Sequence, residues 1–161
     1  AIREATSLHR GLSTTAQPFR CADYAGFCDG VALLRAFCPF TCGCDDARSG
    51  LALSLPNQGC PKKCLTAKNL QLADEACSDM DVSGTANWTR YWHSYQRAMT
   101  SSTLMPRGQG EEVRGFADQM ITGGCAAMSP DPVLSTDSCR VQDGPLHFIG
   151  IGSVRGFCPA R

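Results

Sequence analysis

The chain has 161 residues, which is enough for one compact domain or two small modules. Its fifteen Lys and Arg residues balance fifteen Asp and Glu residues, so the net charge is zero and no long-range field attracts nucleic acid. No apolar run approaches the roughly 18 residues that a membrane-spanning helix requires. We therefore expect no nucleic-acid partner and no membrane insertion. Cysteine is the compositional extreme, at eleven of 161 residues.

The cysteine spacing indicates disulfides rather than a metal site. Zinc sites need two close pairs such as Cys-x2-Cys, and no such pair occurs in this sequence. Disulfides persist in oxidising compartments, so we predict a chain that is secreted or lies in an oxidising lumen, with no metal and no cofactor. All eleven cysteines are predicted to form bridges: Cys21, Cys28, Cys38, Cys42, Cys44, Cys60, Cys64, Cys77, Cys125, Cys139 and Cys158.

The N-terminal part divides into an arm and a cysteine-rich module. Residues 1–20 are polar and show no sustained period, which predicts an extended arm that can reach a neighbouring molecule. Residues 21–59 are predicted to form a disulfide module. Within it, one or two helical turns over residues 29–37 are expected to pack on the bridges through Val31, Leu33, Leu34 and Phe37.

The module opens with Cys21-Ala22-Asp23 and closes with Cys38-Pro39-Phe40-Thr41-Cys42-Gly43-Cys44. These residues resemble a ShKT (sea-anemone toxin-like) module, and the closing run also resembles cysteine-rich secreted proteins of unicellular algae. Residues 21–44 contain five of the six cysteines of the family pattern, and one residue rather than two separates the last pair. The family's disulfide pairing is therefore not carried over to this chain.

The resemblance implies either potassium-channel blocking or an accessory role beside extracellular enzymes. Blockers present a Lys-Tyr pair shortly before the closing cysteines, where the ammonium plugs a carbonyl-lined filter. Between Cys28 and Cys38 the charged residues of this chain are Asp29 and Arg35, and no Lys-Tyr pair is present. We therefore expect no channel block.

The next stretch, residues 45–64, is rich in glycine and proline and is predicted to be a loop with a short strand at residues 51–55. Thr66 is predicted to cap a helix that runs to about Cys77. The inner side of this helix is expected to hold Leu70, Ala73 and Cys77.

Residues 60–128 are predicted to form a small helical domain. No cysteine occurs between residues 78 and 124, so order there must come from apolar burial. Two sets of apolar side chains recur at three- and four-residue steps and predict two amphipathic helices that pack together. The first set is Trp88, Tyr91, Trp92, Tyr95, Ala98 and Met99, and the second is Val113, Phe116, Ala117, Met120, Ile121 and Cys125. Glu111 and Glu112 are expected in the first turn of the second helix, where carboxylates favour the helix dipole.

Two short motifs lie at the start of this domain. Asn87-Trp88-Thr89 is a sequon and predicts a glycan on Asn87. Residues 79–84 match the first half of a calcium-binding EF-hand loop, but the twelfth position holds Arg90 instead of a bidentate Glu. This stretch is therefore interpreted as an acidic turn that caps a helix, not as a calcium site.

The end of the chain repeats an earlier segment. Residues 150–159 align without gaps with residues 30–39 and share a glycine, an arginine and the run Phe-Cys-Pro. The match predicts a partial second ShKT-like module over residues 129–161 and a tandem-repeat arrangement. Since the first copy continues to Cys42, we expect the native chain to continue past Arg161 to a further cysteine. Alternatively, the odd cysteine is a free thiol or forms an intermolecular bridge.

The predicted fold is a small, disulfide-rich, mainly α protein with tandem ShKT-like modules around a helical domain. The sequence contains no phosphate-binding loop, serine-hydrolase elbow or metalloprotease motif. We therefore predict a noncatalytic structural or adhesive component of an extracellular or lumenal assembly, in its sharper form a repeating polymer subunit. Its expected partners are proteins, either copies of itself or members of a larger complex.

Two alternatives remain open. A carbohydrate-binding or enzyme-accessory module would use exposed Trp88 or Trp92, whose rings form a sugar platform when solvent reaches them. A lumenal subunit of a larger membrane complex would show a broad apolar patch. No enzyme is predicted, since activity would require His93 or His147 to converge with an acidic group in one cleft. The acidic candidates are Asp79, Asp81 and Glu111.

Overall fold

The computed structural model describes residues 19–73, 78–101, 108–128 and 149–160. The described residues are helical or irregular and contain no strand, which confirms the predicted small, disulfide-rich, mainly α fold. None of the described helices combines the length and the apolarity that crossing a bilayer requires. The helices are η1 (Cys21–Phe27), α2 (Ala32–Phe37), α3 (Pro39–Cys42), η2 (Pro56–Gln58), α4 (Lys62–Ala73), α5 (Ala86–Ser101), α6 (Gly110–Gly123) and η3 (Gly124–Ala127).

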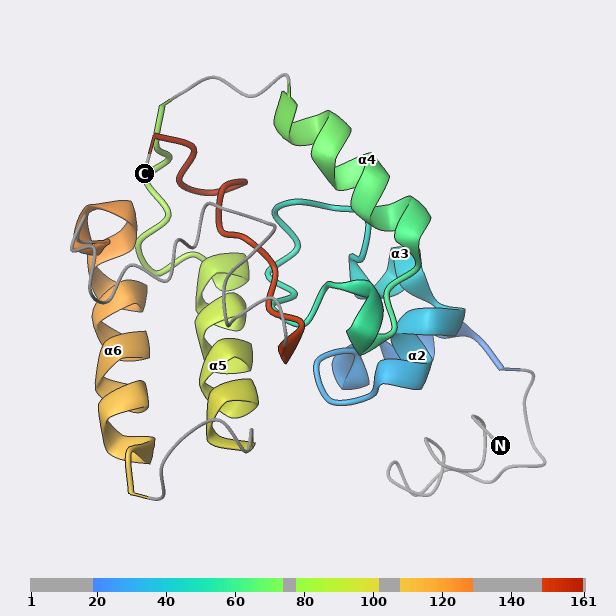
Figure 1. Cartoon of the computed structure of the whole chain (residues 1–161), viewed down its shortest axis with the longest axis horizontal. Coiled ribbons are helices and arrows are strands. Elements are labelled where there is room, and N and C mark those ends of the chain that lie inside the picture. Colours follow the sequence, from blue (N-terminus) through green and yellow to red (C-terminus); the bar gives the residue numbers. More distant parts are fainter. Residues whose placement is uncertain (1–18, 74–77, 102–107, 129–148, 161) are drawn as a thin grey trace.

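The described residues form two halves with separate buried cores. The disulfide-rich half, residues 19–60, contains the short helices α2 and α3 and a core of cysteines with Tyr24, Leu34 and Leu51. The helix-pair half contains α5, α6, η3 and the C-terminal segment 149–160. Figure 1 shows the two halves beside each other, with the C-terminal segment (red) between them and α4 along one side.

The predicted pair of amphipathic helices is confirmed. α5 buries Trp88, Tyr91, Trp92, Tyr95 and Ala98, and α6 buries Val113, Ala117 and Met120 against it. The two helices lie side by side in Figure 1. The indole N–H of Trp88 donates to the carbonyl of Met120 at 2.7 Å, so this fully buried ring also satisfies its polar group. The helix period predicts this pairing because one face of each helix is apolar.

Two further predictions concern the starts of α6 and α5. Glu111 and Glu112 lie in the first turn of α6, as predicted. The turn before α5 is held by Ser83, whose hydroxyl donates to the carbonyl of Thr122 at 2.6 Å, and by Thr85, whose hydroxyl donates to the carbonyl of Val82. The 78–85 stretch thus connects to the end of α6.

The helix predicted from Thr66 begins earlier. α4 starts at Lys62, directly after Pro61, and the Thr66 hydroxyl donates to the Lys62 carbonyl at 3.3 Å inside the helix instead of capping it. The predicted inner face is also wrong for Leu70, whose side chain is 66% exposed. Cys64 and Leu72 are the buried residues of α4. The Cys44–Cys60 bridge ends just before α4 and fixes where the helix starts and which side it turns inward.

The strand predicted at residues 51–55 does not form. Leu51, Ala52 and Leu55 are buried as a strand would require, but the backbone makes bends. Its hydrogen bonds reach the C-terminal segment: Gly152 N–H donates to Ala52 O at 2.7 Å and Leu55 N–H to Gly150 O at 3.4 Å. Two such bonds fix the C-terminal segment against the loop without building a sheet.

The sulfur bridges and the cores cross two predicted domain boundaries. The Cys44–Cys60 bridge joins the predicted module 21–59 to the first residue of the predicted helical domain. The Cys125–Cys158 bridge joins η3 to the C-terminal segment, whose Ile151, Val154 and Phe157 lie in the same core as α5 and α6. The described part of the C-terminal segment therefore completes the helix-pair core.

The repeated motif adopts two different structures. Residues 32–37 form a helix, whereas the matching residues 152–157 are irregular and then form a turn. The reason lies in the substitutions, because Ala32 and Ala36 correspond to Gly152 and Gly156, and glycine disfavours helix. A Cβ at Gly156 would lie 2.5 Å from the carbonyl oxygen of Ala47, so the glycine also permits close backbone approach.

Candidate functional site

Eight of the predicted bridge-forming cysteines are paired in the described structure: Cys21–Cys38, Cys28–Cys42, Cys44–Cys60 and Cys125–Cys158. Cys77 and Cys139 lie outside the described residues. Cys64 departs from the prediction, since it is a buried free thiol. Every other cysteine that the structure describes is already bridged, so no second free thiol is placed beside Cys64.

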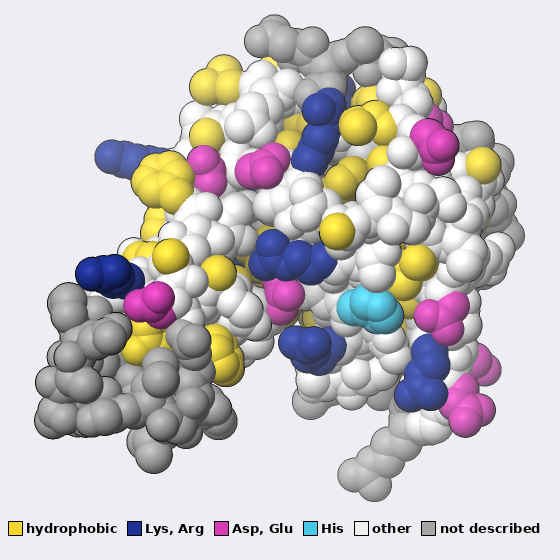
Figure 2. Space-filling model, turned by 180° about the vertical axis from the view of Figure 1, so that it is seen from behind, with side chains coloured by type: hydrophobic (Ala, Val, Ile, Leu, Met, Phe, Trp, Pro, Cys, Tyr) yellow, Lys and Arg dark blue, Asp and Glu magenta, His cyan; other side chains and the backbone are white. Residues whose placement is uncertain are grey.

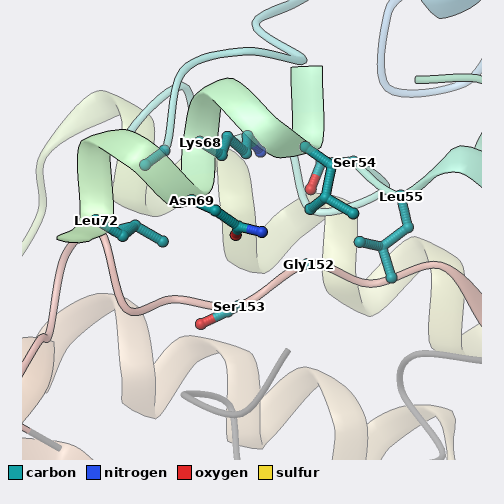
Figure 3. Close-up of a pocket in the computed structure, with 9 residues that line it drawn as sticks. Ser54, Leu55, Lys68, Asn69, Leu72, Gly152 and Ser153 are labelled. Carbon is teal, nitrogen blue, oxygen red and sulfur yellow. The ribbon is translucent and has the colours of Figure 1, made fainter. Parts of the chain in front are cut away.

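Cys64 lies one helical turn before Lys68, and Lys68 lines a shallow hollow between α4, the loop at residues 47–55 and the C-terminal segment. The hollow measures about 330 Å³, including the part that is open to solvent. Asn69 extends from α4 toward it, and Ser54 and Ser153 line the other walls (Figure 3).

Burial changes the proton affinities of two groups on this helix. Desolvation lowers the pKa of Lys68 from 10.5 to about 8, although Asp46, Asp45 and Cys64 act in the opposite direction. Lys68 keeps some exposed surface, but desolvation is the larger effect. Burial, followed by the charge of Asp45, raises the pKa of the Cys64 thiol. A thiol with a raised pKa carries less thiolate at neutral pH and is therefore a weak nucleophile.

The predicted aromatic residues face the core. Trp88 is fully buried and Trp92 is 1% exposed, each in edge-to-face contact with neighbouring rings. Neither indole ring is available at the surface to stack on a sugar. The interpretation of this stripe as a core face is confirmed.

The acidic residues considered for catalysis do not converge in the part of the chain that the structure describes. Asp79 and Asp81 precede α5, and the neighbouring Gly84 N–H donates to Ile121 O near the end of α6. Glu111 lies at the start of α6, where Gly110 approaches Thr100 at the far end of α5. A helix of sixteen residues is about 24 Å long, so Glu111 and the two aspartates stand at opposite ends of the helix pair.

The other candidate groups are two histidines, a carboxylate of the acidic turn and the predicted glycan site. His93 is exposed on α5, and His147 lies outside the described residues. The carboxylate of Asp79 accepts a hydrogen bond from the Ala160 N–H at 2.9 Å, so it fixes the C-terminal segment. Within the described ranges, no group of three or more His, Cys, Asp or Glu residues is placed to hold a metal ion. Asn87, the predicted glycan site, is exposed in the first turn of α5.

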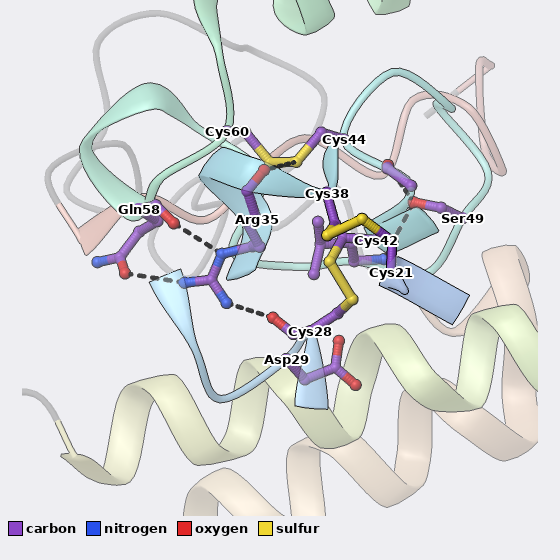
Figure 4. Close-up of a disulfide and its surroundings, with 12 residues drawn as sticks. Cys21, Cys28, Asp29, Arg35, Cys38, Cys42, Cys44, Ser49, Gln58 and Cys60 are labelled. Carbon is purple, nitrogen blue, oxygen red and sulfur yellow. Dashed lines mark hydrogen bonds between the residues drawn. A yellow bond between two sulfur atoms is a disulfide. The ribbon is translucent and has the colours of Figure 1, made fainter. Parts of the chain in front are cut away.

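Arg35 is a buried charged residue inside the disulfide-rich half. Its side chain is 1% exposed and donates to the carbonyls of Cys28 and Gln58 and to the Gln58 side chain (Figure 4). Burial lowers the pKa of Arg35, and the charge of Asp29 partly offsets that effect. Two disulfides, Cys21–Cys38 and Cys28–Cys42, brace the same helices. Together these contacts hold α2 and α3 from the inner side.

The outer side of α2 and α3 is apolar and exposed. We define the α2–α3 surface as the exposed residues Ala32, Leu33, Ala36, Phe37, Phe40 and Thr41. Leu33 is 45% exposed, Phe37 64% and Phe40 77%. The prediction that Leu33 and Phe37 pack on the disulfides is therefore wrong. The disulfide-rich half lies on the left in Figure 2, where hydrophobic side chains stand on its surface.

The α2–α3 surface was not identified from the sequence, although a signal was present. Arg35 is the one charged residue between positions 30 and 44. Once its guanidinium is buried, the exposed side of both helices carries no charge. Sequence patterns place arginine outside and phenylalanine inside, and here the internal carbonyl acceptors reverse that order.

Comparison with protein-family models, with curated proteins and with solved structures finds no match to this chain.

Proposed function

We propose that the protein is a noncatalytic structural component of an extracellular or lumenal assembly, and that it holds a partner protein through the α2–α3 surface. The disulfide-rich half would act as a ShKT-like contact module. The observation that carries the proposal is the exposure of Phe37 and Phe40 on helices that are braced by two disulfides.

Two physical arguments support this role. Exposed aromatic side chains grouped on one surface are typical of protein interfaces, because their burial supplies much of the binding energy. A surface that is already rigid loses little conformational entropy when a partner covers it. The bridges and the buried Arg35 provide that rigidity, since they hold α2 and α3 from beneath.

Secretion is part of the proposal. Four disulfides within the described residues are consistent with an oxidising compartment, where such bridges are stable. Asn87 is exposed, so its side chain is accessible to the glycosylation that a secreted chain can receive.

The proposal is tested by following the tagged full chain, secreted from its native cells, into high-mass extracellular material. The Phe37→Ser/Phe40→Ser variant should lose most of its recovery in that fraction. Leu70→Ser is the matched control, because Leu70 is equally exposed but lies on α4, and it should behave like the wild type. Equal recovery of all three proteins would contradict the proposal.

A further inference from the structure

We propose that the hollow beside α4 binds a small aldehyde, which Lys68 holds covalently as an imine. The hollow shares no residue with the α2–α3 surface, so this second site does not depend on the proposed function. The proposal rests on the Lys68 amine and the Ser54 hydroxyl, which line the same hollow. Reversible attachment of this kind is ligand binding and requires no turnover.

Lys68 differs from the other lysines of the chain. The chain contains three lysines, and all of them lie on α4. Lys62 and Lys63 are exposed in its first turn, whereas Lys68 is half-buried and lines the hollow. Figure 3 shows the Lys68 side chain running along α4, with its nitrogen directed toward the side on which Ser54 lies. The described residues provide no ion pair or hydrogen bond to this nitrogen, so the amine is available to a ligand.

Ser54 contributes a buried hydroxyl to the hollow. The residue is 3% exposed, and its hydroxyl makes no hydrogen bond to the rest of the described chain. Gly152 leaves the space for it, since a Cβ at that position would overlap the Ser54 Oγ. A hydroxyl that is largely removed from water costs free energy until it gains a hydrogen-bond partner. An oxygen of a bound aldehyde would be such a partner.

The charges around Lys68 favour a neutral ligand over an anion. The negative charges of Asp46 and Asp45 act on Lys68, together with the Cys64 thiol. These two charges oppose the approach of a phosphate or a carboxylate, but they do not repel an uncharged aldehyde.

Desolvation also makes the Lys68 amine more nucleophilic at neutral pH. Because it lowers the pKa of Lys68 to about 8, about one tenth of this amine is unprotonated at pH 7. For a lysine with the ordinary pKa of 10.5 the unprotonated fraction is about one in three thousand. The unprotonated amine is the form that attacks a carbonyl carbon.

The other walls of the hollow limit the size of the ligand. They include the side chains of Leu55, Leu65 and Leu72 and the Asn69 amide. The volume of about 330 Å³ includes the part that is open to solvent, and it lies at the lower end of the range for small-molecule sites. The hollow therefore suits a short aldehyde that carries a hydroxyl group, with its carbon atoms against the leucines.

Imine formation needs no oxidant or reductant. The lone pair of the Lys68 Nζ forms a bond to the carbonyl carbon, and the π electrons of the carbonyl move to its oxygen. One proton passes from the nitrogen to that oxygen and gives a carbinolamine. The oxygen then leaves as water together with the second proton of the nitrogen, and a C=N bond remains. Addition of water reverses these steps and releases the aldehyde.

Reductive trapping tests the site. The full, oxidised chain is incubated at pH 7 with glycolaldehyde and sodium cyanoborohydride, which reduces an imine to a stable secondary amine, and the labelled lysines are mapped by mass spectrometry. Lys68 should be labelled at least about tenfold faster than Lys62 or Lys63, and its rate should saturate as the aldehyde concentration rises. Equal or slower labelling of Lys68, or a rate that rises linearly with concentration, would overturn the proposal.

Two variants and a competitor separate a binding site from a merely reactive lysine. Ser54→Ala should lower the trapping rate of Lys68 several-fold and leave Lys62 and Lys63 unchanged. Thr66→Ala is the control, because Thr66 is exposed on α4 and does not line the hollow, and it should behave like the wild type. Inorganic phosphate should not protect Lys68. Protection by phosphate would identify an anion site, and an unchanged rate in Ser54→Ala would remove the role of the hydroxyl; either result would contradict the proposal.

Discussion

Arg90 on α5 and Asp29 in the disulfide-rich half form an ion pair that joins the two halves. The guanidinium Nη2 lies 2.9 Å from Asp29 Oδ1, and Nε donates to both carboxylate oxygens. Arg90 also donates to the carbonyl of Ser49 at 3.0 Å. A single side chain of the helix pair thus fixes the turn before α2 and the loop after α3.

Arg90→Met should lower the free energy of unfolding by about 1 kcal/mol, because the pair is partly exposed and one backbone hydrogen bond is also lost. Chemical denaturation of the oxidised protein measures the change. Arg97→Met is the control, since Arg97 is exposed on the same helix and should alter stability much less. Equal effects of the two substitutions would show that the contact between Arg90 and Asp29 contributes nothing specific.

Gly156→Ala and Gly115→Ala should change stability in opposite directions. The added methyl at Gly156 would lie 2.5 Å from a backbone oxygen of Ala47, and we expect a loss of about 1–3 kcal/mol. Gly115 lies inside α6 with open space around its Cβ position, so alanine should stabilise the helix by about 0.5–1 kcal/mol. Thermal unfolding of both variants provides the test, and a stable Gly156→Ala protein would refute the close passage of the C-terminal segment.

The Cys125–Cys158 bridge should contribute more to stability than either bridge beneath α2 and α3. It closes a span of 33 residues, compared with 14 for Cys28–Cys42. Loop-closure entropy assigns roughly 4 kcal/mol to the longer span and roughly 3 kcal/mol to the shorter. Paired serine replacements at each bridge, compared by urea unfolding, measure the difference. A larger loss from the 28–42 pair would contradict this order.

Lys68 should make stability rise with pH. Its pKa is about 8 in the folded chain, below the ordinary value of 10.5, so between those values the unfolded chain binds more protons than the folded chain. Stability therefore increases from pH 8 toward 10.5, and below pH 8 the cost of a buried ammonium is fully present. Lys68→Met should be more stable than the wild type at pH 7, and the advantage should shrink by pH 9.5. Urea unfolding at both pH values tests the sign, and a constant or growing advantage would contradict it.

The helix pair was predictable from sequence because Trp88, Tyr91 and Trp92 repeat at helical steps and a single burial rule decides their direction. The bounds and the buried side of α4 were harder to predict, because its apolar residues are not gathered on one side and the bridge at Cys60 sets its start. The disulfide pairing could not be predicted either, because it depends on which cysteines meet in the folded chain and not on local spacing.

The sequence pattern predicted the wrong structure in two places, the α2–α3 surface and the repeated motif. Arg35 is the one charged residue of α2, and a sequence pattern places it on the solvent side. The hydrogen bonds of its guanidinium place it inside instead and decide which side of the helix is buried. The aligned residues Phe37 and Phe157 differ in burial: Phe37 is exposed and Phe157 is buried. Identity at five of ten aligned positions did not specify the structure, because the glycines at 152 and 156 disfavour a helix.

The fold of the disulfide-rich half and the proposed role of the α2–α3 surface both depend on oxidised, specifically paired cysteines that hold α2 and α3 in place. Native protein is alkylated without reductant, digested and mapped by mass spectrometry, once folded and once in denaturant. We predict linked peptides for 21–38, 28–42, 44–60 and 125–158, with the buried Cys64 alkylated only after unfolding. Alkylation of Cys21, Cys28, Cys38 or Cys42 in the folded protein would contradict the account.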